Sequence, residues 1–145
     1  MKPTYQTRFG SEGNCLAACF ASILEVPLAK LDFSCSEVEG AGAWYWLAVG
    51  KLDPLGWTYL SSRAGRNRDG ELELSLPDGA YFIVTGSTAR GPLHHAVVCG
   101  VSDRRWSMVH DPHPDGEGLT QIAHVGFLVP SWIFLPRGLQ HGEPR

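Results

Sequence analysis

The sequence lacks any long apolar run. None of its 145 residues belong to a stretch long enough to cross a bilayer, and the opening MKPTYQTRFG has no signal-peptide core. We therefore expect a cytoplasmic protein without a membrane partner. Internal repeats and low-complexity stretches are also missing, so we expect one ordinary globular domain rather than an array of units.

An excess of positive charge is missing too. Twelve Lys and Arg residues stand against 15 Asp and Glu residues, which gives a formal net charge of −3. This balance argues against nucleic acid as the main partner. The cationic cluster at 63–68 is interrupted by Gly65 and followed by Asp69, so we interpret it as a solvated loop.

Cysteine is scarce and irregularly spaced. The four cysteines fit neither a disulfide scaffold nor a zinc knuckle, so we expect free thiols, no metal site and no cofactor. The chain length fits one domain, which we place at residues 1–138, with a flexible tail at 139–145. The oligomeric state stays open.

The N-terminal third has the pattern of helices. An apolar stripe follows Asn14, a suitable N-cap, and ends before Pro27. A second helix is predicted over residues 36–51, with Ser36 as its N-cap and Glu39 in the capping-box position.

After Pro54 the pattern changes to short strands separated by turn signals. Helices followed by hairpin-connected strands predict an α+β fold in which the helices pack on an antiparallel sheet. The predicted strands cover residues 57–62, 71–76, 80–86, 94–101, 105–111 and 125–130, with a further apolar segment at 132–135.

Cys15 is the candidate nucleophile. It directly follows Asn14, and the start of a helix favours a thiolate because the unpaired N–H groups and the helix dipole stabilise negative charge. Cys19 lies on the apolar stripe and Cys99 in the middle of a strand, so both are expected to pack in the core. Cys35 lies in a linker without a basic neighbour in sequence.

A cysteine nucleophile needs a base, and the base needs a group that orients it. His95 begins one predicted strand, Asp111 ends the next, and a short turn joins the two strands. A hairpin would bring these residues together, on the same face in the simplest register. His94 is the competing base, because adjacent strand residues point to opposite faces.

Further residues are candidates for binding. Gln6 is the candidate second oxyanion donor beside the Cys15 N–H, with Asn14 as the alternative. His113 and Trp44 are candidate substrate contacts. The alternatives are an ordinary polar loop for His113 and core packing for Trp44.

With these residues in place, the chain resembles the papain-like cysteine peptidases. It is most similar to bacteriocin-leader peptidase domains and related small bacterial and phage proteins. Gln6 and the stretches NCLAAC, HAVVCG and VHDPHP carry the resemblance, although Gln6 precedes Cys15 by more residues than in those families. The resemblance implies a papain-like fold and a Cys15–His95–Asp111 triad.

The leading hypothesis is a hydrolase that cleaves a peptide or amide bond of a peptide or protein substrate through an acyl-enzyme. A glutamine deamidase or transamidase on the same fold is an alternative, as is a non-catalytic binding module. A metal-binding protein is another, with five candidate ligands: His94, His95, His110, Asp111 and His113.

Overall fold

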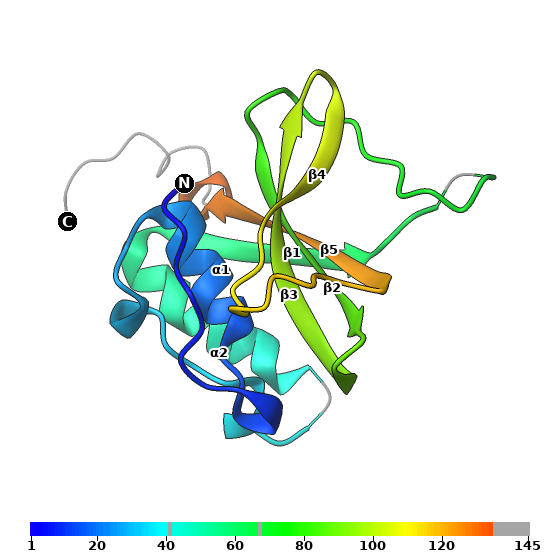
Figure 1. The fold of residues 1–145 in the computed structure, drawn as a ribbon. Helices are drawn as coiled ribbons and strands as arrows, with labels where there is room; N and C mark the ends of the chain where they lie inside the picture. Colours follow the sequence, from blue (N-terminus) through cyan, green and yellow to red (C-terminus); the bar gives the residue numbers. More distant parts are fainter. Residues whose placement is uncertain (41, 67, 135–145) are drawn as a thin grey trace.

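Among the residues that the structure describes, two α-helices precede five β-strands (Figure 1). The computed structural model describes residues 1–40, 42–66 and 68–134, so the predicted tail at 139–145 lies outside the described residues. The elements are α1 (Cys15–Leu24), α2 (Ala43–Leu52), β1 (Trp57–Arg63), β2 (Tyr81–Thr88), β3 (Gly91–Ser102), β4 (Arg105–His110) and β5 (Gln121–Pro130).

The strands form one antiparallel sheet in the order β1-β5-β2-β3-β4. The predicted α+β class is therefore confirmed. Hairpins join β2 to β3 and β3 to β4, whereas β5 inserts between β1 and β2. The sheet is thus less completely built from hairpins than the turn signals predict.

Both α-helices cover the same face of the sheet (Figure 1). A stripe of alanines and small residues lets α1 lie close to β3, and Cys19 and Phe20 are fully buried there. The core between the helices and the sheet continues through Phe33, Tyr59 and Val98. This packing fixes the start of α1 against β3.

The segment predicted as a strand at 71–76 covers the opposite face of the sheet instead. It has only an isolated bridge, between Arg66 and Leu72, and Leu72 packs into a second apolar cluster with Phe82 and Val97. The alternating pattern therefore reflects one-sided packing of an irregular segment, because no neighbouring strand pairs with it.

The predicted helix at 36–51 is also corrected. Its capping box lies earlier, between Ser34 and Glu37, and serves a short 3₁₀-helix. Helix α2 starts only after Gly42, whose φ of 78° is left-handed and unfavourable for other residues. Residues 131–134 likewise form a 3₁₀-helix rather than a strand.

Within residues 1–40, 42–66 and 68–134, none of the helices has the length and apolarity that crossing a membrane requires.

Candidate active site

Cys15 is the first residue of α1, as the sequence predicts. Asn14 occupies the N-cap position, but its side chain does not cap the helix. Its Oδ1 accepts the N–H groups of Thr7 and Arg8 at 3.0 and 3.1 Å, and its Nδ2 donates to Asp32 at 2.7 Å. Asn14 therefore holds the N-terminal segment beside Cys15.

His95 and Asp111 are in direct contact. His95 Nε2 lies 2.6 Å from Asp111 Oδ1, and both residues are buried. Asp111 also accepts the backbone N–H groups of His113 at Oδ1 and of Gly118 at Oδ2, each at 2.8 Å. With Asp111 ionised, the shared proton belongs on Nε2 of His95, which leaves Nδ1 as the free acceptor.

The register of the β3–β4 hairpin decides whether this contact can form. Near the turn the register pairs Cys99 with Met108. Continued unchanged, it would bring Asp111 opposite Ala96, on the strand face away from His95. The simplest register, on which the sequence prediction rests, would therefore keep the two residues apart.

A bulge in β4 corrects the register. Val109 has no partner in β3, and the next pair is Val98 with His110. This shift by one residue turns Asp111, which follows directly, to the face of His95. The predicted contact is present, but for a reason that the sequence pattern does not contain.

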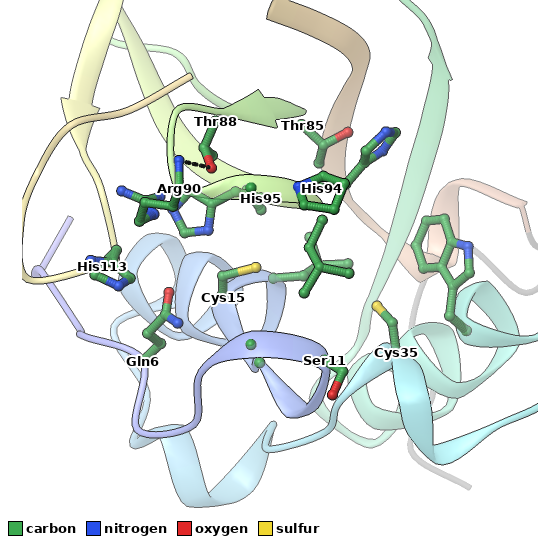
Figure 2. Close-up of a pocket in the computed structure, with 18 of the residues that line it drawn as sticks. Gln6, Ser11, Cys15, Cys35, Thr85, Thr88, Arg90, His94, His95 and His113 are labelled. Atoms are coloured by element: carbon green, nitrogen blue, oxygen red, sulfur yellow. Dashed lines mark hydrogen bonds between the residues drawn. The ribbon is translucent and has the colours of Figure 1, made fainter. Parts of the chain in front are cut away.

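Cys15 and His95 line one cavity of about 580 Å³. Figure 2 shows the two side chains on its inner wall, with Gln6 and His113 to one side of Cys15 and Cys35 and Thr85 to the other. The cavity lies between the start of α1 and the part of β3 that extends past the end of β4. A substrate carbonyl in this cavity would therefore have a thiol and an imidazole within one enclosure.

The protonation of the thiol differs from the helix-start expectation. Burial raises the pKa of Cys15, and the N–H groups of Ala96, Leu16 and Cys15 itself oppose this effect without cancelling it. Burial also lowers the pKa of His95, by more than the neighbouring Asp111 raises it. At neutral pH these two directions favour a neutral thiol at Cys15 and a neutral imidazole at His95.

Asp111 remains ionised despite its burial. Burial alone would raise its pKa, but the hydrogen bonds from His95 and from the N–H groups of His113 and Gly118 bring the pKa below its usual value. At neutral pH a charged acceptor is thus held against Nε2 of His95.

Gln6 lies in the cavity wall with Cys15, as predicted. Its backbone N–H donates to Pro112 at 3.0 Å, which ties it to the loop after Asp111. Its Nε2 donates to the Arg8 carbonyl at 2.9 Å, and its buried Oε1 has no hydrogen-bond partner among the described residues. One N–H of the side-chain amide remains for a ligand, so an oxyanion role stays a prediction.

His113 also lines the cavity, with its ring centroid 6.3 Å from that of His95. It packs edge-on against Phe9, and its Nδ1 lies 3.0 Å from Asp115. His113, the predicted substrate contact, therefore lies beside His95 in the cavity.

Arg90 is a site residue that the sequence reading missed. The Nη1 atom of its guanidinium group lies 2.6 Å from Asp115 Oδ1 and 3.9 Å from Asp111 Oδ2. The Arg90 side chain also lines the cavity. It belongs to the tight β2–β3 turn only five residues before His95, and that spacing is the signal that could have indicated it.

Trp44 is half-buried and lines the cavity, while also packing on the helix–sheet core. Core packing of Trp44 is therefore confirmed, and its position in the cavity wall leaves the substrate contact as a prediction. The nearby Trp46 is 73% exposed and does not line the cavity. His94 is exposed and also lines the cavity, but the partner of Asp111 is His95.

The predicted metal ligands do not converge. His110 Nε2 lies 2.8 Å from the Thr4 carbonyl oxygen. In the described part of the chain, no three His, Cys, Asp or Glu side chains form a group that could hold a metal ion. The four cysteines are all free, with Cys19 and Cys99 buried as expected and Cys35 exposed in the cavity wall.

In comparisons with known proteins, no family model matches the chain and no curated protein matches it.

Proposed function

We propose that this protein is a cysteine hydrolase with a papain-like fold that cleaves a peptide or amide bond through Cys15, His95 and Asp111. The observation that carries the proposal is the 2.6 Å contact between His95 Nε2 and Asp111, in a cavity that also holds the thiol at the start of α1. A nucleophile, a base and a group that orients the base are the parts that acyl transfer requires.

The first half of the reaction forms an acyl-enzyme. His95 Nδ1 takes the proton of the Cys15 thiol, and the sulfur attacks the substrate carbonyl carbon to form a C–S bond. The tetrahedral intermediate then collapses, the C–N bond breaks, and His95 returns the proton to the leaving amine. Asp111 stabilises the imidazolium that exists between these two transfers.

The second half regenerates the thiol. His95 removes a proton from a water molecule, the water oxygen attacks the thioester carbon, and the C–S bond breaks as the proton returns to sulfur. In both halves the oxyanion is stabilised by the N–H of Cys15, with the free amide N–H of Gln6 as the second donor. His113 and Trp44 contribute to substrate binding from the cavity wall.

Alkylation by iodoacetamide tests the activation of Cys15 without knowledge of the substrate. Because burial raises the thiol pKa, Cys15 without a base should react only in alkaline solution. With His95 as base we expect reaction at neutral pH, and His95→Ala should slow it by about 10²-fold. Mass spectrometry reports each cysteine separately, and His94→Ala, which removes the neighbouring imidazole, should keep most of the rate.

Two results would contradict the proposal: Cys15 reacting no faster than Cys35, or His95→Ala leaving the Cys15 rate unchanged. A peptide library analysed by mass spectrometry then separates the reaction classes. Hydrolysis shortens peptides, whereas deamidation converts glutamine to glutamate in peptides of unchanged length.

A further inference from the structure

The cavity continues past the triad into a region from which the proposed function uses only Trp44. We call this region the distal arm and define it by Trp44, Tyr59, Ser61, Thr85 and His124. Thr85 and His124 are paired neighbours in β2 and β5, and β1 follows on the other side of β5. In Figure 2, Thr85 lies on the side of Cys15 away from Gln6 and His113.

Two aromatic side chains, Trp44 from α2 and Tyr59 from β1, line the arm together with the hydroxyl groups of Ser61 and Thr85 and the imidazole of His124. Leu16 and Leu93 add apolar surface to the same cavity. The Tyr59 side chain lies across Gly126 of β5, where any larger residue would collide with it. The Tyr45 hydroxyl, which donates to the Tyr59 carbonyl at 2.5 Å, joins α2 to this wall. The arm is therefore a fixed recess rather than a gap between elements.

The charges of the cavity are one-sided. The described residues that line it include Arg90 and four histidines but no Asp, Glu or Lys, although the whole chain has a net charge of −3. The carboxylates of Asp111 and Asp115, which contact two lining residues of the cavity, are already engaged with His95 and Arg90. A lysine or arginine side chain entering the cavity would lose hydration without gaining a carboxylate partner.

We propose that the distal arm binds an uncharged apolar or aromatic side chain of the substrate, next to the attacked carbonyl, and excludes lysine and arginine. This inference rests on the proposed function, since the arm opens from the cavity that holds Cys15. An aromatic ring would gain contact with Trp44 and be removed from water, whereas a cation would face only Arg90 and imidazoles.

Chloromethyl ketones provide the test, because the Cys15 sulfur displaces chloride and forms a C–S bond faster when the amino-acid side chain of the reagent is bound beside it. The probes are the chloromethyl ketones of tosyl-phenylalanine and tosyl-lysine. Rates at Cys15 are measured by mass spectrometry and divided by the iodoacetamide rate of the same variant. We expect the phenylalanine reagent to react at least about tenfold faster than the lysine reagent.

Two variants on one helix locate the preference. Trp44→Ala should bring the two normalised rates to within about threefold of each other, whereas Trp46→Ala, which changes an exposed residue two positions away, should keep the tenfold preference. Ser61→Glu places a carboxylate in the arm and should raise the rate of the lysine reagent by about threefold or more. His95-dependent labelling by iodoacetamide in the same variant shows that Ser61→Glu is folded, so that the gain is due to the carboxylate.

Equal rates for the two reagents in the wild-type protein, or a preference that survives Trp44→Ala, would overturn the inference about the arm. If either of these results is found while iodoacetamide still labels Cys15 rapidly and in a His95-dependent way, the proposed function is left intact. Slow, His95-independent labelling by iodoacetamide would instead overturn the proposed function.

Discussion

Asp111 reaches His95 because Val109 bulges out of β4. The register of the hairpin near its turn would place the two residues on opposite faces, and the one-residue shift brings Nε2 of His95 to 2.6 Å from the carboxylate. The pair is thus a product of a local irregularity in the sheet. Bulges are common near active sites because they redirect a side chain in this way.

Replacing Asp111 by asparagine should lower the pKa of His95 further. The carboxylate raises that pKa, against the larger opposing effect of burial, and the neutral amide cannot do so. Nuclear magnetic resonance titration of the His95 ring measures the shift directly. Asp53→Asn, at an exposed position, is the control, and an unchanged or higher His95 pKa in Asp111→Asn would contradict the account.

Replacing Arg90 by glutamine should raise the pKa of His95. The guanidinium charge, beside Asp111, is one of the groups that lower that pKa. The pH at which neutral His95 becomes available as a base should therefore move upward, and with it the pH dependence of Cys15 alkylation. Arg105→Gln, in an exposed position near the β3–β4 turn, should leave the profile in place. A downward shift in Arg90→Gln would show that Arg90 acts on the site in another way.

Acid should destabilise the fold through the same pair. His95 has a lowered pKa when folded, so the unfolded chain binds the proton more readily and stability is lost as pH falls below about 6.5. The pKa of Asp111 is also lowered in the folded protein. Asp111 therefore contributes stability above about pH 3.9, and this stability is lost as pH falls through the folded pKa. Urea unfolding between about pH 7.5 and 3 should show both losses.

His95→Gln should remove the loss of stability that begins below about pH 6.5. His94→Gln is the matched control, since it removes one imidazole from the adjacent, exposed position. A free energy of unfolding that still falls between about pH 7 and 5 in His95→Gln, to the wild-type extent, would show that another group is responsible.

Replacing Gly86 by a larger residue should strongly destabilise the sheet. A Cβ at this position in β2 would overlap the backbone carbonyl of Gln121, where the register of β2 with β5 shifts. We expect Gly86→Ala to cost about 3 kcal/mol or more of unfolding free energy, since backbone must move. Gly50→Ala, in open space on α2, should instead be neutral or stabilise by about 0.5–1 kcal/mol. Equal effects in thermal unfolding would show that the sheet adapts at Gly86.

The sequence predicts which residues meet at the site better than how they come to meet. A cysteine at a helix start, a His in one strand and an Asp at the end of the next are local features, and their positions were predicted correctly, except that Asp111 directly follows β4 rather than ending it. The bulge at Val109 was not, because it depends on which residue opposes which across the hairpin. Arg90 was missed because its partners, Asp111 and Asp115, are more than 20 residues away.

Three other differences have the same origin. The alternation at 71–76 has the period of a strand, yet no neighbour pairs with it beyond one bridge at Leu72. The start of α2 depends on the left-handed backbone at Gly42, which composition alone does not locate. The direction of the Cys15 pKa depends on burial by β3, which outweighs the effect of the helix start. The first and third are tertiary effects that override a local preference, whereas the second is a local backbone conformation.

Acyl transfer to Cys15 tests the central claim most directly. The protein is mixed with p-nitrophenyl acetate at neutral pH, quenched at intervals and analysed by mass spectrometry for an acetyl thioester at each cysteine. The account predicts that Cys15 is acetylated first and then regenerated by hydrolysis, and that His95→Ala slows both steps by about 10²-fold. Acetylation of Cys15 at the same rate as Cys35, or at the same rate without His95, would contradict it.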